Sequence, residues 1–578
     1  MSNGRKLTTP QAVNSAIKDI CDVLRRSGAA GAMQYVPELT WLLFLRILDE
    51  REEREAERAE AQGWQFTPSL EAPYRWRDWA APSGEQRKSF SKGELGKAKK
   101  FVDEELLPYL RGLETQTFAT PRQRVISEIM FGVERTRIDT DTNLLDVLDR
   151  VHAISERAID RTHVFPISQA YEGLLLRMGE KNNDGGQFFT PREVIRAVVA
   201  AINPQAGERI YDPSCGTGGF LAQAYDYIWE REAESLTSDE IERLRRETFY
   251  GRDKEDLIYP IALANLVLHG IDEPHIWHGN TLTTVPSASE HRPFGELPAQ
   301  YDVVLTNPPF GGKENKQAQD RFTFRTSSTQ VLFIQHVIGS LKMNGRCGIV
   351  LDEGVLFRTN ETAFVQTKRK LLDDCDVWCI VSLPAGTFLG AGGGVKTNLV
   401  FFTRGKPTET IWYYDLSDVK VTKRNPLTLA AFDEFFRLLP ERGESNRSWT
   451  VDITARRAKA KSEADEVSSQ ADDIEEYAKQ LGARLLELRR AKDFDQAEID
   501  EIEQEQKRAI KQVRDLRAKA QAIEAAAFDL KAVNPNTLTQ DRKPTTRELL
   551  DLIEAKGREV DAALARLRAL QSNGDDLL

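Results

Sequence analysis

One stretch organises this sequence: Tyr301-Asp302-Val303-Val304-Leu305-Thr306-Asn307-Pro308-Pro309-Phe310. Its first half is aliphatic and β-branched, which is typical of a parallel strand that is buried on both faces. Two consecutive prolines can continue neither a strand nor a helix, so the chain turns sharply there. The turn presents an amide and an aromatic ring at the carboxyl end of the strand, where open α/β sheets bind ligands. An ordinary strand-ending turn is the simpler interpretation, and only the upstream motifs favour a functional one.

The first of these motifs is the run from Glu208 to Ala222, which predicts a short strand, a glycine-rich turn and a helix. The glycines allow a ligand to approach the backbone closely, and Asp212 ends the strand. The G-x-G-x-x-G spacing of dinucleotide-binding folds is absent because Leu221 occupies its last position, and no P-loop lysine is present. An acid before the glycines instead favours a cationic ligand.

Two more strands are predicted further along the chain, at Phe249 to Asp253 and at Ile276 to Asn280. An acid at the end of the second strand of a nucleotide-binding sheet accepts ribose hydroxyls. Before the first strand, Thr190 and Glu193 predict a Thr-x-x-Glu capping box with Pro191 in the first turn of a helix. The positive end of such a helix can seat a carboxylate, although most capping boxes are only structural.

In this order, the motifs resemble those of S-adenosylmethionine-dependent adenine-N6 DNA methyltransferases with the γ arrangement. More closely, the chain resembles the modification subunit of type I restriction-modification systems. The resemblance covers nearly the whole chain and rests on these segments: Gln187 to Pro191, Asp212 to Phe220, Asp253, Asn307 to Phe310, Leu383 to Phe388, Gly394 to Phe402, Phe528 to Asn536 and the apolar helix Leu39 to Leu48.

The resemblance implies a role for each matching residue. Asn307 and the Pro308-Pro309 turn would accept the hydrogens of an adenine amine, and Phe310 would stack on the flipped base. No metal is required, because the methyl group of the donor is already activated. Many relatives carry an acid after the third strand, where this chain has Asn280. The residues implied to hold S-adenosylmethionine are Gln187, Phe188, Phe189, Thr190, Pro191, Arg192, Asp212, Gly216, Thr217, Gly218, Gly219 and Asp253.

The expected fold is α/β: a Rossmann-like methyltransferase core with a helical N-terminal domain and a C-terminal helical or coiled-coil extension. We divide the chain into a helical domain at 1–165, the catalytic domain at 166–415, a connecting segment at 416–455 and a partner-binding region at 456–578. Within the first domain, helices are predicted at Lys18 to Arg26, Tyr35 to Arg54 and Leu144 to Ala158, and an irregular stretch at Trp64 to Pro82. A helix at 331–341 and strands at 347–351, 377–383 and 397–402 complete the sheet.

Two apolar stripes mark the C-terminal region, one from Ile474 to Leu488 and one from Ile499 to Ile523. The break between them favours a helical hairpin over one continuous coiled coil. A further amphipathic helix is predicted at Leu549 to Leu570. By the resemblance, these helices dock on a separate specificity subunit, with two copies of this chain per specificity subunit, double-stranded DNA as substrate and room for a restriction subunit.

Composition limits the other possibilities. The chain of 578 residues has a net charge of −11, so its whole surface is not a nucleic-acid footprint, although the segment from Gly311 to Arg325 is locally basic. That segment is either a flexible loop that meets phosphates or an ordinary surface loop. Five cysteines without a CxxC pair predict neither zinc nor a disulfide, and the absence of a signal peptide or membrane anchor places the protein in the cytoplasm. Methylation of protein glutamine or RNA amino groups, and a non-catalytic scaffold, remain as alternatives.

Overall fold

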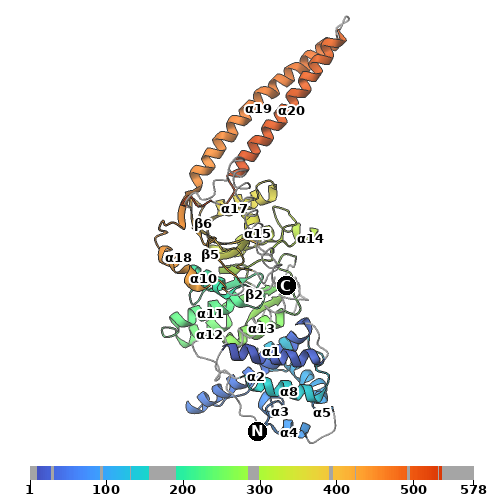
Figure 1. Cartoon of the computed structure of the whole chain (residues 1–578), viewed down its shortest axis with the longest axis vertical. Helices are drawn as coiled ribbons and strands as arrows, with labels where there is room; N and C mark the ends of the chain where they lie inside the picture. Colours follow the sequence, from blue (N-terminus) through green and yellow to red (C-terminus); the bar gives the residue numbers. More distant parts are fainter. Residues whose placement is uncertain are drawn as a thin grey trace, which may run out of the picture.

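The computed structural model describes residues 10–27, 32–91, 96–130, 132–154, 190–283, 298–388, 395–422, 425–490, 495–531 and 533–536. Three parts follow one another along the long axis of the molecule: a helical N-terminal domain, a domain built on one large sheet, and a pair of long helices that projects from the sheet domain (Figure 1). This order agrees with the α/β core and the two helical extensions expected from the sequence.

The N-terminal domain is helical. The predicted helices at Lys18 to Arg26 and Tyr35 to Arg54 lie within α1 and α2, and the third forms α8, which ends at His152. The stretch predicted to be irregular contains a short helix, α3, whose Trp76 and Trp79 are buried in the core of this domain. The elements are α1 (Pro10–Arg26), α2 (Ala32–Ala61), α3 (Trp76–Trp79), α4 (Glu85–Ser91), α5 (Lys97–Phe101), η1 (Val102–Leu106), α6 (Leu107–Arg111), η2 (Leu113–Thr115), α7 (Pro121–Met130) and α8 (Asp141–His152).

The central sheet has nine strands in the order β3-β2-β1-β4-β5-β7-β6-β8-β9. Strands β1 to β5 run parallel to one another, whereas β7 is antiparallel to both β5 and β6. The carboxyl ends of β1, β2, β3 and β4 therefore meet at one edge. The strands are β1 (Ile210–Asp212), β2 (Phe249–Asp253), β3 (His275–His278), β4 (Tyr301–Thr306), β5 (Leu341–Asp352), β6 (Cys375–Ser382), β7 (Thr397–Arg404), β8 (Thr410–Asp415) and β9 (Ser448–Asp452).

Helices cover both faces of this sheet. In β4, Val303 and Leu305 face one apolar core and Val304 faces the other, which explains the continuous apolar run in the sequence. The first core contains α10 (Arg192–Ile202), α11 (Gly219–Glu232), α13 (Tyr259–His269) and α18 (Asp433–Leu438), and the second contains α15 (Thr329–Ser340), α16 (Glu353–Phe357) and α17 (Thr362–Asp374). The remaining elements are α12 (Ser238–Arg246), α14 (Lys316–Gln319) and η6 (Leu429–Phe432).

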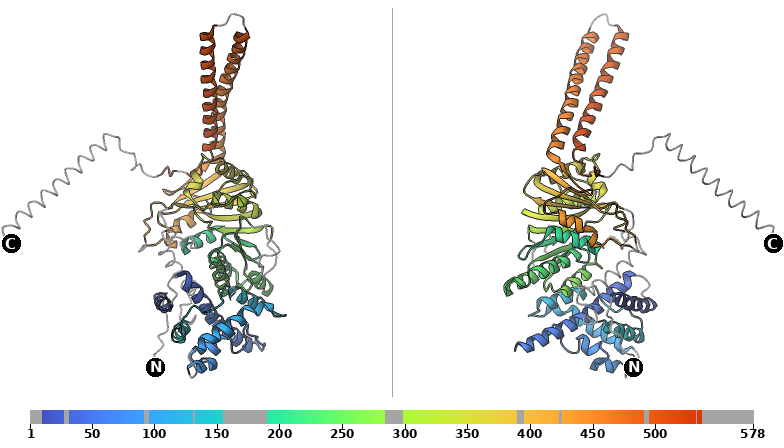
Figure 2. Two further views of the ribbon diagram at one scale, coloured as in Figure 1. Left: turned by 90° about the vertical axis from the view of Figure 1, so that its right-hand side faces the viewer. Right: turned by 60° about the vertical axis from the view of Figure 1, so that its left-hand side comes forward.

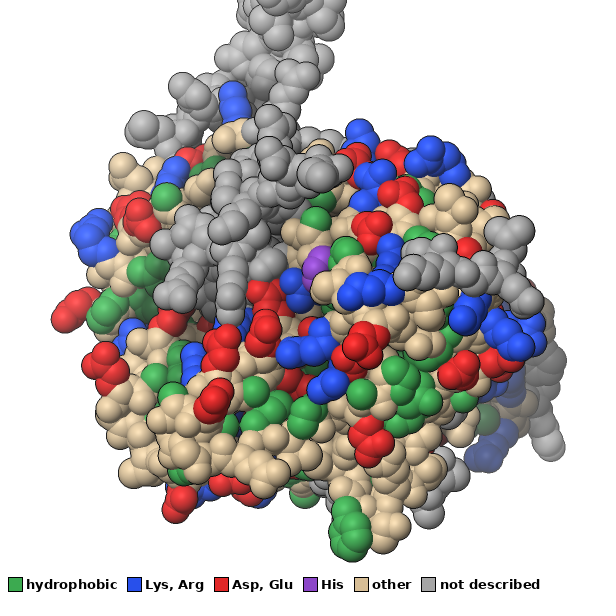
Figure 3. Space-filling model, turned by 90° about the horizontal axis from the view of Figure 1, so that it is seen from below, with side chains coloured by type: hydrophobic (Ala, Val, Ile, Leu, Met, Phe, Trp, Pro, Cys, Tyr) green, Lys and Arg blue, Asp and Glu red, His purple; other side chains and the backbone are tan. Residues whose placement is uncertain are grey.

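The N-terminal domain packs on the sheet domain through α13. Arg51 of α2 donates to the Val267 carbonyl at 2.6 Å and pairs with Asp272 at 3.3 Å. The Tyr259 hydroxyl of α13 donates to the buried Glu128 carboxylate of α7 at 3.2 Å. From below, where this domain lies, basic and acidic side chains are interspersed rather than gathered by sign (Figure 3).

The C-terminal helices form an antiparallel hairpin, as the break in the apolar stripes favoured. Helix α19 (Ile453–Arg490) continues directly from β9 and lies beside α20 (Gln496–Ala526) over their full length (Figure 2). The Tyr477 hydroxyl of α19 donates to Glu505 of α20 at 2.7 Å. The seam is narrow because α19 buries mainly small residues, at the seven-residue spacing Ala464, Ala471, Ala478 and Leu485.

After the hairpin, the chain returns to the sheet domain. Phe528 and Leu530 are buried in the second core, and the Tyr413 hydroxyl donates to the Leu530 carbonyl at 2.9 Å. The hairpin is thus anchored to the sheet domain at both ends. The segment 416–455, which we predicted to be only a connector, contributes β9 to the sheet. The predicted helix at Leu549 to Leu570 lies outside the described residues. No helix in the described part of the chain combines the length and apolar character that a membrane span requires.

Candidate active site

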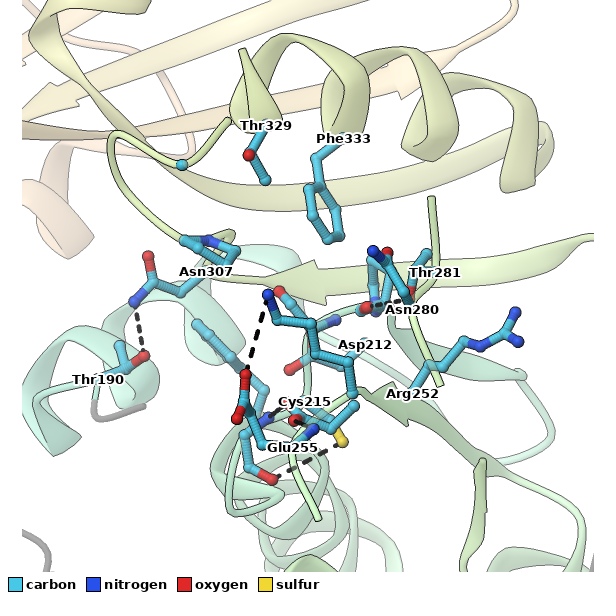
Figure 4. A pocket seen from close by; sticks show the side chains of 18 of the residues that line it. Thr190, Asp212, Cys215, Arg252, Glu255, Asn280, Thr281, Asn307, Thr329 and Phe333 are labelled. Carbon is cyan, nitrogen blue, oxygen red and sulfur yellow. Dashed lines mark hydrogen bonds and ion pairs between the residues drawn. The ribbon is translucent and has the colours of Figure 1, made fainter. Parts of the chain in front are cut away.

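A pocket of about 170 Å³ lies at the edge where β1, β2, β3 and β4 end (Figure 4). It brings together eight of the residues singled out from the sequence: Thr190, Asp212, Gly216, Thr217, Gly219, Asp253, Asn307 and Pro309. Five others lie nearby without lining it: Pro191, Arg192, Gly218, Pro308 and Phe310. Gln187, Phe188 and Phe189 lie outside the described residues.

Asp212 forms the floor of the pocket and is 1% exposed. Its Oδ1 accepts from the Ser214 N–H at 3.0 Å and from the Thr306 hydroxyl at 2.7 Å. Burial raises the pKa of Asp212 to about 7, the negative charge of Asp253 adds to the rise, and the two hydrogen bonds oppose it. A buried carboxyl with a raised pKa would be stabilised in its charged form by a cation.

This pKa predicts how Asp212→Asn changes stability with pH. The asparagine Oδ1 can keep both hydrogen bonds. Between pH 4 and 7 the unfolded aspartate loses its proton and the folded one keeps it, so the wild type loses stability as pH rises, by roughly 4 kcal/mol in all. The stability advantage of the variant should therefore grow from pH 5 to pH 8 in thermal unfolding.

Asp302→Asn is the control. At Asp302 the hydrogen bonds from Lys342 and the Arg209 N–H outweigh burial and lower the pKa, so the carboxyl is ionised in both the folded and the unfolded chain over the tested range. The stability difference of this variant should be flat from pH 5 to pH 8. Parallel pH profiles for wild type and Asp212→Asn would contradict the assignment.

Asp253 ties two backbone segments together at the end of β2. Its Oδ2 accepts from the Gly216 N–H and its Oδ1 from the Glu255 N–H, both at 3.0 Å. Burial raises its pKa to about 6. Glu255, which we did not predict, adds another carboxylate to the pocket lining. Its position two residues after Asp253 is a signal that the sequence contains.

The glycine-rich turn is shaped by helix packing as much as by ligand access. Gly218 has a φ of 79°, which glycine adopts readily, and a Cβ there would lie 3.1 Å from Leu266 of α13. The Asn265 side chain, also from α13, donates to the Thr217 carbonyl at 2.8 Å. Helix α11 then begins at Gly219, which lines the pocket, and its N-terminus has no side-chain cap.

Asn307 lies where the sequence placed it, just beyond β4. Its Nδ2 donates to Thr190 Oγ1 at 2.9 Å (Figure 4). Its Oδ1 is buried and has no hydrogen-bond partner among the described residues. The predicted capping box is therefore wrong: α10 begins at Arg192 with Pro191 as its uncapped N-cap residue, because the Thr190 hydroxyl bonds Asn307 instead.

The rest of the Pro-Pro corner is held by the other sheet elements. The Pro308 carbonyl accepts from Gln330 Nε2 at 3.5 Å, and Gln330 in turn accepts from the Asp352 N–H at 3.2 Å. The Phe310 ring packs edge-on against Phe388, with 5.4 Å between ring centres. An aromatic pair thus stands beside Asn307, outside the pocket proper.

The segment after Phe310 is folded over the pocket rather than being an open loop. The Glu314 N–H donates to the Ser327 carbonyl at 2.8 Å, and α14 buries Ala318. Glu314 and Lys313 line the pocket with Phe333 of α15, none of which we predicted from the sequence. These residues are far from the glycine-rich turn in the sequence, so no local pattern indicates that they line the same pocket.

Of the remaining reactive side chains, Cys215 lines the pocket, whereas His336 and the other cysteines do not. All five cysteines are buried with free thiols. Burial and the nearby charges of Arg321 and Arg252 lower the pKa of His336 to about 4. Among the described residues, no three metal-binding side chains lie close enough together to hold an ion.

Comparison with known proteins gives consistent matches. A family model described as N-6 DNA Methylase matches residues 163–478, and one described as HsdM N-terminal domain matches residues 13–151. The methylase subunit of the type I restriction enzyme EcoEI from Escherichia coli is 34% identical over 462 residues, which cover 76% of this chain and 87% of that protein.

Two solved structures show the same architecture. One is a modification subunit assigned to a type I restriction enzyme from Vibrio vulnificus YJ016, with a TM-score of 0.66, 31% identity, and coverage of 78% of this chain and 94% of that chain. The other, from a structure on the complex assembly and conformational transition of a type I R-M system, has a TM-score of 0.61 and 31% identity over 98% and 99% of the two chains.

These matches decide between the functions that the sequence left open. They cover the helical domain and the pocket domain together, and they favour DNA adenine over protein glutamine or RNA amino groups. The chain therefore belongs to the N-6 DNA methylase family, as the adenine-modifying methylase subunit of a type I restriction-modification system.

Proposed function

We propose that this subunit holds S-adenosylmethionine in the pocket and transfers its methyl group to N6 of an adenine flipped out of double-stranded DNA. The observation that carries the proposal is the Asn307 side chain, whose buried Oδ1 lacks a partner while its Nδ2 is engaged by Thr190. A buried acceptor without a donor costs stability, so such a group is expected where a ligand supplies the donor.

The chemistry of adenine explains why an acceptor is needed. The lone pair of the exocyclic amine is delocalised into the ring, which makes the nitrogen a weak nucleophile. Asn307 Oδ1 would accept one N–H hydrogen and the Pro308 carbonyl the other, which draws the amine out of conjugation. The Phe310 and Phe388 rings offer a stacking surface that helps offset the cost of unstacking the base, a few kcal/mol.

The pocket residues fit the proposed donor. Members of this methyltransferase family depend on S-adenosylmethionine, which when bound supplies an activated methyl group. Asp212 suits its cationic methionine end, since a cation there favours the ionised carboxyl. Asp253 and Glu255 present acceptors for the ribose hydroxyls, and the uncapped start of α11 suits the methionine carboxylate. Gln187, Phe188, Phe189 and Arg192 complete the donor site in this proposal.

The experiment uses labelled S-adenosylmethionine and DNA, with and without the neighbouring specificity protein, followed by digestion to nucleosides. We expect label in N6-methyladenine when the specificity protein is present and little without it, because the described part of the chain contains no domain dedicated to reading DNA sequence. Absence of labelled adenine in both reactions contradicts the proposal.

Thr190→Val tests whether the threonine orients Asn307. Valine keeps the shape and removes the hydrogen bond, so the amide can rotate away from its working orientation. We expect kcat to fall by roughly 10- to 100-fold with little change in the affinity for S-adenosylhomocysteine, and Thr190→Ser to restore activity. A loss of affinity with unchanged kcat would instead make Thr190 a donor-binding residue.

We further propose that the hairpin of α19 and α20 docks on the specificity subunit, with two methylase subunits per specificity subunit and a place for a restriction subunit. The hairpin extends away from the pocket domain (Figure 1). A groove along it is lined by Ala478, Ile510, Val513 and Ala518, with Glu475, Arg514, Arg517 and Gln521 beside them. Apolar residues flanked by charges suit a helix of the partner.

Ile510→Glu tests this docking surface. Ile510 lies in the groove with 56% of its surface exposed, so glutamate should leave the fold intact and weaken specificity-subunit binding at least 10-fold by isothermal titration calorimetry. Leu486→Glu is the matched control, because Leu486 is 58% exposed on the same hairpin but does not line the groove. Unchanged binding by Ile510→Glu contradicts docking in the groove. Truncation at residue 455 is a poorer test because it also removes Phe528 and Leu530 from the core.

A further inference from the structure

Two side chains of the pocket have no role in the proposed function so far. Asn280 follows β3 and Glu314 follows the Pro-Pro corner, and both line the pocket. Three strand spacings separate the ends of β4 and β3, about 14 Å. That length leaves room for a nucleoside between the methyl-transfer end and this pair.

Hydrogen bonds fix the orientation of both side chains. Asn280 Oδ1 accepts from the Leu282 N–H at 2.9 Å, which identifies its Nδ2 as the donor to Glu314 Oε2 at 3.4 Å. Glu314 Oε1 accepts from the Thr329 hydroxyl at 3.2 Å. The carboxylate is therefore held in place against the pocket from two sides.

The pair offers a pattern of donors and acceptors. A carboxylate has about four acceptor sites, and the two contacts use only two of them. The Asn280 amide carries two N–H donors. An acceptor beside a donor matches the edge of adenine that bears the 6-amino group and N1. Figure 4 shows the Phe333 ring directed into the same part of the pocket, where it offers a face to a base.

We propose that Glu314 and Asn280 select the adenine base of the methyl donor, with Glu314 accepting from the 6-amino group and Asn280 donating to N1. This inference rests on the proposed function and deepens it. It also gives Asn280 a role. Because the residue after β3 is an amide and cannot supply a carboxylate, the carboxylate that accepts from the 6-amino group is that of Glu314, in the segment after the Pro-Pro corner. The segment after the Pro-Pro corner, which contributes Glu314 to the pocket, would thereby contact the base of the bound donor directly.

Isothermal titration calorimetry with S-adenosylhomocysteine and S-inosylhomocysteine tests this without any turnover. The inosyl compound has a carbonyl oxygen in place of the amino group and a hydrogen on N1, so it faces Glu314 with an acceptor and Asn280 with a donor. Wild type should prefer the adenosyl compound on the order of 100-fold. Glu314→Gln, which can keep both protein contacts and also donate, should reduce this preference to about 10-fold, because the mismatch between the N1 hydrogen and Asn280 remains.

The control is Glu255→Gln, which alters a carboxylate in the same pocket and should change both affinities by a similar factor. The ratio of two affinities on one preparation does not depend on the folded fraction. A full preference in Glu314→Gln, or no preference in wild type, overturns the inference and leaves the proposed function standing. Failure of wild type to bind either compound overturns both.

Discussion

Asn307→Ala is expected to lower the rate of methyl transfer by roughly three orders of magnitude, the range seen when one group that stabilises a transition state is removed. Alanine removes the buried oxygen that lacks a partner, together with the Nδ2 bond to Thr190, and keeps both prolines of the corner. The amine of the target base would then remain conjugated and unreactive. Single-turnover measurements with the donor and DNA at saturation report this step directly.

Binding measurements separate this loss from a loss of fold. The affinity of Asn307→Ala for S-adenosylhomocysteine should stay within a few-fold of wild type, because Asp212 and Asp253 of the donor site lie on β1 and β2 and not at the Asn307 corner. The variant should also gain stability or lose little, since an unpaired buried oxygen disappears. Near-normal turnover in this variant would remove Asn307 from the mechanism.

Asp253→Ala is expected to weaken S-adenosylhomocysteine binding by roughly 100-fold. Asp253 accepts from the backbone N–H groups of Gly216 and Glu255, so its removal frees two segments of the pocket wall as well as deleting an acceptor for ribose. Calorimetric titration gives the affinity, and thermal unfolding shows whether the protein is folded.

Glu255→Ala provides the comparison for Asp253. The Glu255 side chain is 41% exposed and pairs only loosely with Lys254 at 3.8 Å, so its loss should cost less than 10-fold in affinity. If Asp253→Ala is folded and binds as tightly as wild type, Asp253 is a structural acid and not part of the donor site.

Much of the fold could be predicted because its signals are local. The apolar run before Asn307 indicated a strand covered on both faces, and Val303, Val304 and Leu305 indeed alternate between two cores. The break between the charged helices indicated a hairpin. By contrast, β9 was not predicted, because the short run Ser448–Asp452 becomes a strand only through its pairing with β8.

The motifs of the site could be predicted from the sequence, but the contacts between residues far apart in the chain could not. Asp212, Asp253 and Asn307 follow strands whose carboxyl ends meet, so their proximity follows from the topology. The bond between Thr190 and Asn307 joins residues 117 positions apart, and nothing local distinguishes it from a helix cap. Glu314 was not predicted for the same reason, because its proposed role depends on Asn280 and Thr329, which only the fold brings next to it.

In the proposed reaction, this chain methylates N6 of adenine at the Asn307 corner. The most direct test is mass spectrometry of nucleosides after reaction of DNA and the specificity protein with a donor that carries a trideuterated methyl group. We predict N6-trideuteromethyladenine with the wild type and none with Asn307→Ala. Label on another base or on protein, or equal labelling by Asn307→Ala, would contradict the claim.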